Sequence, residues 1–174
     1  HSTLALDGLS SARLGEGDLI VEAPGDVRLE RRRSDLSTGL IAGHDGYVAS
    51  HGLTHVRQIY LSHDGRGLQG EDVIATVERE DERAFDRALD ETGGGIPFSV
   101  RFHLHPDVAA RIAEDGQSFE LMLKSGELWI LRHTGSAALS LVPSVYLDVG
   151  QLEPTPTSQI VLRATAMDYA TRIS

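Results

Sequence analysis

The chain has 174 residues and a mass of 18.8 kDa, and its 26 acidic residues outnumber its 16 lysines and arginines to give a formal net charge of −10 at pH 7. Such an acidic surface repels phosphate backbones and anionic lipids, so we expect neither nucleic acid nor a membrane as a partner. The absence of cysteine excludes disulfides, a thiol nucleophile and cysteine-ligated zinc. We predict a single domain, residues 1–174, with 40% hydrophobic residues available for its core.

The first residues of the chain bear on whether it is part of a longer protein and on where that protein is located. No apolar run approaches the roughly 20 residues of a membrane span, and no signal peptide is recognisable. Because the chain starts at His1 rather than at methionine, we expect it to be the C-terminal part of a longer protein, whose targeting signal would lie upstream. The compartment is therefore left open by the residues themselves.

Short segments rich in Val, Ile, Leu and Thr alternate with glycine and proline, which is typical of an all-β protein. Turn sequences occur at 45–46, 63–65, 115–116 and 124–127, and the last two are expected to close hairpins. We predict strands at 2–6, 27–33, 38–49, 53–61, 67–78, 96–105, 108–113, 117–124, 127–133, 137–142, 144–149 and 158–166. So many short strands without a strong helix predict a two-layer antiparallel β-sandwich.

Residues 78–91 break the strand pattern because they are dense in acids and arginines. Apolar residues recur at helical spacing, so the segment could form a short amphipathic helix over the sheet; they are Ala84, Phe85, Ala88 and Leu89. The alternative is a solvated loop that ends at the glycines 93–95, since short charged helices are marginal alone. Either interpretation makes the region around 78–92 a surface excursion between two strands.

Histidine is the main candidate for chemistry. His103 and His105 lie two apart in the predicted strand 96–105, which places both rings on one face and close enough to share a metal ion. A cupin-type site would need a glutamate four or five residues further on, where the chain has Ala109 and Ala110. The simpler interpretation is a pair of histidines on the wet face of the strand.

Three more histidines and a basic run have simpler interpretations than a functional site. His44, His51 and His55 fall in and around a predicted hairpin, where we expect ordinary cross-strand polar contacts. The run 31–33 is Arg-Arg-Arg, which could touch a polyanion but is more simply a solvated strand. No P-loop and no Gly-x-Ser-x-Gly elbow occurs in the chain.

Several motifs taken together resemble a known family. They are His-Ser-Thr-Leu at 1–4, Gly-His-Asp-Gly-Tyr at 43–47, Leu-Ser-His-Asp-Gly-Arg-Gly-Leu-Gln-Gly-Glu-Asp at 61–72 and Arg-Phe-His-Leu-His-Pro at 101–106. In this order, from His1 to about Leu162, the chain resembles the C-terminal region of bacterial heparinase II/III-like proteins. Single pieces such as Asp-Gly are unspecific, whereas the combination is fairly specific.

The resemblance implies a β-sandwich that follows an upstream α/α toroid in a polysaccharide lyase, which cleaves uronate-containing glycans such as glycosaminoglycans by β-elimination. It implies an acidic polysaccharide as the partner of the intact protein and makes a periplasmic location plausible. The family's catalytic groups come largely from the toroid, so we expect no catalytic residue here and no activity of this piece alone. His1 matches a metal ligand of zinc-containing members, which implies zinc in the intact protein and none in this piece.

Two other classes of function remain open. One is a non-catalytic structural or carbohydrate-binding module, although only 5% of the residues are aromatic. The other is a self-contained metalloenzyme that uses His103 and His105. A net charge of −10 opposes an anionic glycan, so any attractive surface must come from the toroid or from the arginines at 31–33 and Arg101.

Overall fold

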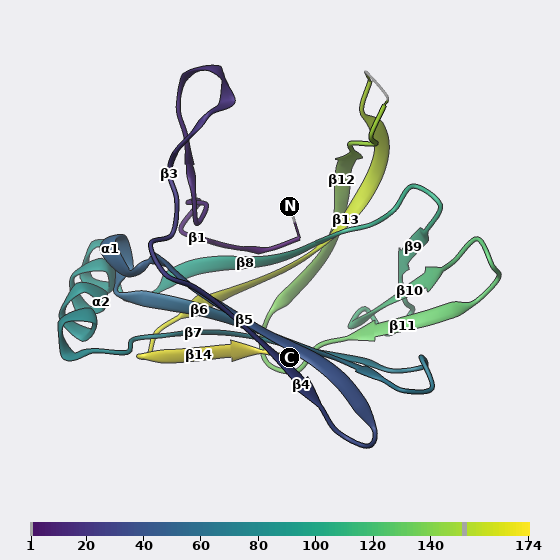
Figure 1. The fold of residues 1–174 in the computed structure, drawn as a ribbon, viewed down its shortest axis with the longest axis horizontal. Helices are drawn as coiled ribbons and strands as arrows, with labels where there is room; N and C mark the ends of the chain where they lie inside the picture. Colours follow the sequence, from purple (N-terminus) through teal and green to yellow (C-terminus); the bar gives the residue numbers. More distant parts are fainter. Residues whose placement is uncertain (1, 151–152) are drawn as a thin grey trace. The chain divides into compact units, whose positions relative to one another are not determined.

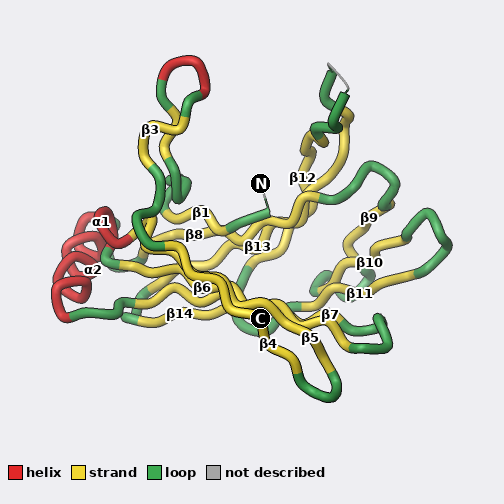
Figure 2. Tube along the Cα trace, in the orientation of Figure 1, coloured by secondary structure: helices red, strands yellow, loops and turns green. Residues whose placement is uncertain are grey.

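The computed structural model describes residues 2–150 and 153–174, and strands dominate them (Figures 1 and 2). The chain divides into two compact units. Unit 1 comprises His1–Leu4 and Ser99–Ala164, and unit 2 comprises Ala5–Phe98 and Thr165–Ser174. Antiparallel sheets and little helix confirm the predicted all-β sandwich class. No helix in the described ranges is long and apolar enough to cross a membrane.

Unit 2 is built on a five-stranded antiparallel sheet with the order β14-β7-β6-β5-β4. The strands pair without interruption except for a register shift in β5 between His44 and Tyr47. A separate hairpin of β2 (Arg13–Leu14) and β3 (Ile20–Glu22), with the 3₁₀ turn Glu16–Asp18 between them, projects from this unit (Figure 1). The bounds of the sheet strands are β4 Val27–Arg33, β5 Ser37–Tyr47, β6 Leu53–Ser62, β7 Leu68–Ala75 and β14 Ala170–Ile173.

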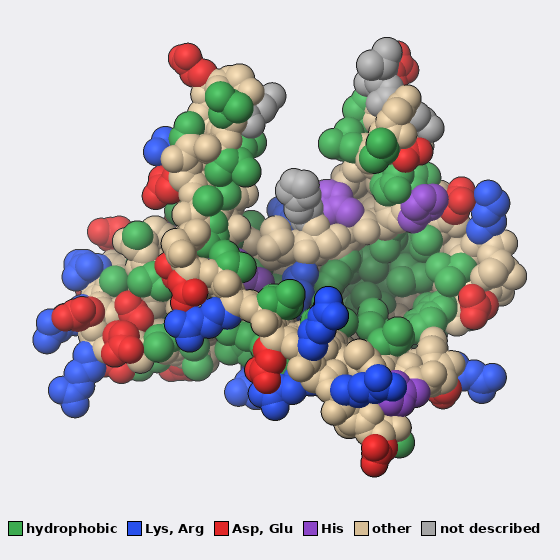
Figure 3. All heavy atoms as spheres, in the orientation of Figure 1, with side chains coloured by type: hydrophobic (Ala, Val, Ile, Leu, Met, Phe, Trp, Pro, Cys, Tyr) green, Lys and Arg blue, Asp and Glu red, His purple; other side chains and the backbone are tan. Residues whose placement is uncertain are grey.

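The charged segment forms a helix, α2 (Arg79–Glu91), so the helical alternative is confirmed over the loop. Its first turn is closed by a capping box in which the side chains of Glu78 and Asp81 each accept a hydrogen bond from the other residue's backbone. Phe85 and Ala88 are buried on its inner face, and charged side chains of both signs cover the outer surface (Figure 3). Tertiary packing of this apolar face thus stabilises a helix that would be marginal alone.

Unit 1 contains a three-stranded sheet with the order β11-β10-β9, formed by β9 (Ala109–Ile112), β10 (Ser118–Met122) and β11 (Leu128–Arg132). Its two hairpins close at 115–116 and 125–126, as predicted. A four-stranded sheet has the order β1-β8-β13-β12, and residues of its strands β1, β8 and β13 are divided between the two units. Its strands are β1 Leu4–Leu6, β8 Ile96–His103, β12 Ala138–Tyr146 and β13 Thr155–Ala166.

Two local predictions are wrong for identifiable reasons. Asp45-Gly46 is not a turn between strands, because β5 continues through it as a bulge and the chain reverses instead through the short helix α1 (Val48–His51). The predicted strands 137–142 and 144–149 are one strand, β12, in which Pro143 pairs with Ser158. Proline is tolerated there because β12 lies at the edge of its sheet.

The contact between α1 and α2 gives the first prediction. Gly52 ends α1 with a φ of +65°, and a β-carbon added to it would overlap the carbonyl oxygen of Asp81 in α2. We expect Gly52→Ala to lower the free energy of unfolding by about 2–4 kcal/mol, measured by urea denaturation, because it combines backbone strain with overpacking. Gly65→Ala is the matched control: its φ is +70° but its surroundings are open, so about 1 kcal/mol is expected. Equal losses for the two variants would contradict the close contact.

Candidate functional site

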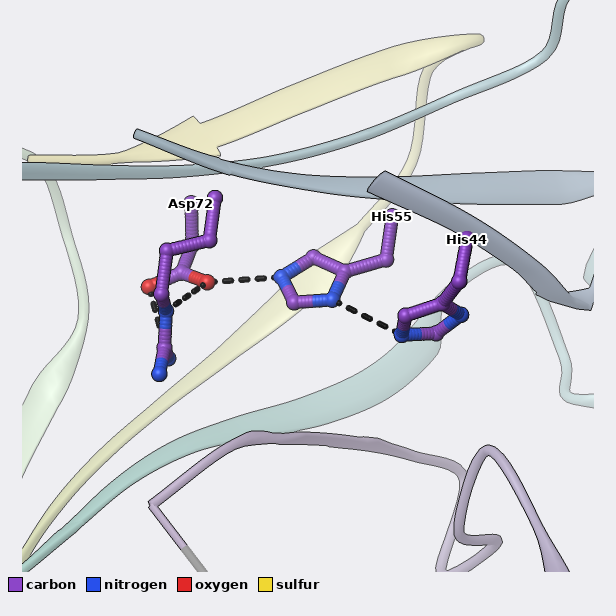
Figure 4. A network of polar contacts seen from close by, with 4 residues as sticks. His44, His55 and Asp72 are labelled. Carbon is purple, nitrogen blue, oxygen red and sulfur yellow. Dashed lines mark hydrogen bonds and ion pairs between the residues drawn. The ribbon is translucent and has the colours of Figure 1, made fainter. Parts of the chain in front are cut away.

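Four polar side chains form a continuous, largely buried network on one face of the five-stranded sheet (Figure 4). His44 of β5 lies opposite His55 of β6, and Arg57 of β6 lies opposite Asp72 of β7. His55 and Arg57 are two residues apart in a strand, so the two pairs share one face of the sheet. His55 and Asp72 are 4% and 6% exposed, so a polar and a charged side chain are buried in the core here.

The hydrogen bonds of the network assign a tautomer to each imidazole. The backbone N–H of Gly46 donates to Nδ1 of His44 over 3.2 Å, so the proton of His44 is on Nε2. That Nε2–H points to Nδ1 of His55 at 3.2 Å, which places the proton of His55 on its own Nε2. His55 Nε2–H then donates to Oδ1 of Asp72 over 2.6 Å. In this arrangement both imidazoles donate in the same direction, towards Asp72.

Arg57 supplies the charge that allows a carboxylate to be buried here. Its Nε donates to Oδ1 of Asp72 over 2.9 Å and its Nη2 donates to Oδ2 over 3.0 Å, a bidentate pair. Burial on its own would raise the pKa of Asp72, but the hydrogen bonds from His55 and Arg57 outweigh it and hold the pKa below 3.8. Asp72 therefore stays ionised inside the sheet.

The outer end of the network packs against Tyr47. The rings of His44 and Tyr47 are 5.5 Å apart between centroids, and Tyr47 is fully buried. Burial raises the pKa of Tyr47 to about 12, although hydrogen bonds with Ser11 act in the opposite direction. This phenol is neutral at any physiological pH and serves as a packed ring.

The geometry leaves the network no free base. Nδ1 of each histidine already accepts a hydrogen bond, and Asp72 accepts from two neighbours. Neither imidazole can take a proton from a substrate without losing one of these bonds, so the arrangement stabilises the sheet and does not form a general-base site. Among residues 2–150 and 153–174, no group of three or more His, Asp or Glu side chains could hold a metal ion.

The structure tests the histidine predictions unevenly. The cross-strand contact of His44 with His55 is confirmed. The cross-strand contact expected of His51 is wrong, because this residue lies in α1 and not on a hairpin strand. It is 6% exposed, with Nδ1 2.8 Å from Oγ of Ser50 and Nε2 3.7 Å from Oδ2 of Asp7. Asp72 was missed, although an acid between Gly70 and Ile74 on the apolar alternation of a strand is a sign of a buried, paired carboxylate.

The candidate metal ligands of the sequence lie elsewhere. His1 is outside the described residues, so its role as a zinc ligand stays a prediction. The strand expected to carry both His103 and His105 ends at His103, whose Nδ1 lies 2.7 Å from Oγ of Ser144. His105 follows the strand, with its ring 4.9 Å from that of Tyr146. These two histidines have different partners, and no third ligand accompanies them in the described part of the chain.

Fold and network define an all-β sandwich in which a buried ion pair and two hydrogen-bonded histidines stabilise the five-stranded sheet. The family model for the C-terminal region of heparinase II/III-like proteins (Heparinase II/III-like, C-terminal) matches residues 1–174, and the chain belongs to this family.

Individual relatives are much longer than this chain. Over 142 residues it is 34% identical to FtsZ-localized protein C of Caulobacter vibrioides (strain NA1000 / CB15N). The aligned region covers 80% of this chain and 23% of that protein. Heparan sulfate lyase HepC from Pedobacter heparinus matches with a TM-score of 0.66 and 11% identity, over 99% of this chain and 23% of the lyase. Heparinase III matches with a TM-score of 0.64 and 12% identity, over 99% of this chain and 22% of that enzyme. At these identities the two lyase structures show the shared fold alone.

The ion pair in the network gives the second prediction. Asp72→Asn places an amide where Arg57 and His55 both donate, and leaves the guanidinium, whose side chain is 16% exposed, without its countercharge. We expect a loss of about 3–5 kcal/mol in the free energy of unfolding, measured by urea denaturation. Glu71→Gln is the control, because the neighbouring Glu71 lies on the opposite face and pairs loosely with Arg172 at 3.5 Å. A loss above about 1 kcal/mol for this control, or below it for Asp72→Asn, would contradict the assignment.

The tautomers of the network give a pH prediction. Burial first, and the neighbouring His55 second, lower the pKa of His44 below 6.5, while Asp45 acts in the opposite direction. Because the folded-state pKa is the lower one, the unfolded chain binds the proton more tightly. The contribution of His44 to stability is therefore complete above pH 6.5 and is lost as the pH falls through the folded-state pKa.

Urea denaturation between about pH 8 and about pH 5 checks this expectation. The wild type should lose stability on the acid side, and His44→Gln, whose amide can still donate to His55, should lose less over the same interval. Parallel curves for the two proteins would show that His44 does not titrate in the folded state.

Proposed function

We propose that this chain is the C-terminal β-sandwich of a longer polysaccharide lyase that cleaves uronate-containing glycans by β-elimination. The observation that carries the proposal is the match of the heparinase II/III-like C-terminal family to residues 1–174. The TM-score of 0.66 to a heparan sulfate lyase, over 99% of this chain, supports it at the level of the fold. Bacterial origin and an acidic polysaccharide such as a glycosaminoglycan follow as parts of the same proposal.

The chemistry divides between this chain and the rest of the protein. Elimination needs a base for the C5 proton, an acid for the departing O4 and a group that neutralises the uronate carboxylate. The buried network cannot supply the base, because its nitrogen lone pairs already accept hydrogen bonds. We therefore assign the proton transfers to an upstream α/α toroid. A zinc site of the intact protein, with His1 as one ligand, would likewise draw ligands from outside the described residues.

A second candidate is a non-catalytic structural or carbohydrate-binding module. It is favoured by the 34% identity to FtsZ-localized protein C, a higher identity than either lyase structure shows. In this case the sandwich would act in a protein that localises with FtsZ, and the closed network would serve stability alone.

An eliminase assay distinguishes these candidates. The full-length protein is incubated with uronate-containing glycans, and the new ultraviolet absorbance of the unsaturated uronate product is followed. We expect product from at least one glycan with the full-length protein and none with the 174-residue chain alone. A full-length protein that cleaves none of them, but co-sediments with FtsZ polymers, would overturn the lyase proposal in favour of the module.

A further inference from the structure

The outward face of β8 collects polar side chains in unit 1. Along this strand Phe98 and Val100 are buried, whereas the alternate residues Arg101 and His103 are only partly covered. These two lie about 7 Å apart at the Cα on the same side of the strand. Both belong to the motif Arg-Phe-His-Leu-His-Pro at 101–106, none of whose residues takes part in the buried network.

Neighbouring strands extend this face with hydrogen-bonding groups. Nη1 of Arg101 donates to Oε1 of Gln159 on β13 over 3.4 Å, and Nδ1 of His103 lies 2.7 Å from Oγ of Ser144 on β12. Ser144 pairs with Thr157, two residues from Gln159, so both contacts are made on one face of the β12–β13 pair. Residues from three strands therefore form one polar surface.

An imidazole and a phenol lie at the end of this surface. The ring of His105 meets that of Tyr146 edge-on, with centroids 4.9 Å apart and an interplanar angle of 68°. The backbone N–H of Asp107 donates to Nδ1 of His105 over 3.1 Å, so Nε2 of His105 carries the proton and is a donor. Tyr146 pairs with Thr155 in the same alternating set as Ser144 and Thr157.

Arg101 is one of the arginines that could attract an anionic glycan, and it lies beside the hydrogen-bonding groups of this face. Within the described residues no carboxylate lies within 4.0 Å of its guanidinium. Arg32, by contrast, pairs with Glu30 at 2.7 Å. Arg31 and Arg33 lie on the edge strand β4 opposite Leu40 and Thr38, in a different sheet from the histidine and the glutamine beside Arg101.

We propose that the face formed by Arg101, His103, His105, Ser144, Tyr146 and Gln159 binds a uronate residue of an acidic glycan. The inference rests on the proposed function and names the part of this chain that meets the substrate. Arg101 binds the carboxylate, since a guanidinium matches its geometry and charge. Gln159 and His105 bind ring hydroxyls, and the phenol of Tyr146 supplies an apolar surface with a polar tip.

The test is a calorimetric titration of the 174-residue chain with a uronate-containing tetrasaccharide at low salt. Arg101→Ala should weaken binding about tenfold or more, the usual worth of a charge-assisted hydrogen bond, and Arg101→Lys by less. Tyr146→Ala should weaken it independently of charge. Arg33→Ala is the matched control, because it removes the same charge from an exposed strand and should change affinity less than twofold. Unchanged urea midpoints would show that each variant is folded.

The outcomes separate this inference from the proposed function. Weaker binding for Arg33→Ala with Arg101→Ala unaffected would overturn the inference in favour of the edge strand. Equal effects of both substitutions would indicate attraction by net charge alone and would also overturn it. If no tetrasaccharide binds while the full-length protein cleaves the glycan, the inference fails and the lyase proposal stands. If binding follows Arg101 while the full-length protein cleaves nothing, the face is a binding site of a non-catalytic module.

Discussion

The buried carboxylate of Asp72 is the constraint on which the five-stranded sheet depends. An ionised acid that is 6% exposed is tolerated only with its countercharge and hydrogen bonds in place, and Arg57 and His55 provide both. All three must share one face of the sheet, and a slip of one residue between β6 and β7 would place Asp72 on the opposite face. The ion pair therefore selects the register as well as stabilising it, and the tautomers of His55 and His44 follow from it.

Hydrogen-bond satisfaction distinguishes the buried network, which stabilises the sheet, from the outward face of β8, which we propose as a binding surface. In the buried network every nitrogen lone pair of the two histidines accepts a hydrogen bond, so it offers a ligand nothing. The outward face of β8 differs, because within residues 2–150 and 153–174 the guanidinium of Arg101 contacts a neutral amide and no carboxylate. A domain whose net charge is −10 can still meet an anionic glycan if its attraction is concentrated at one such face. Membership of the heparinase II/III-like family is compatible with this division, since a sandwich can contribute binding while the chemistry lies in another part of the protein.

Local patterns predicted most of the strands, because the alternation of a strand and the motif of a turn each involve only residues close together in the sequence. The period of two in 96–105 identifies β8, and the Asp-Gly and Ser-Gly turns identify the hairpins of β9, β10 and β11. Local patterns were insufficient where a distant neighbour decides. The helix α1 was not predicted and depends on contact with α2, and the choice between helix and loop for α2 depends on burial of Phe85. Similarly, β14 forms by pairing with the edge of β7, and no local pattern in residues 170–173 predicts this strand.

The sequence by itself determined the all-β class and the family, because composition, alternation and ordered motifs are local properties of the chain. Only the tertiary structure decided what each histidine does. Asp72 lies 17 residues beyond His55 on the neighbouring strand, and Ser144 lies 41 residues beyond His103 on a strand of the same sheet. Only the assembly of the sheets brings these pairs within hydrogen-bond distance. Whether an imidazole is buried in the core or lies on an exposed face depends on these partners. The spacing of residues along the chain does not reveal them.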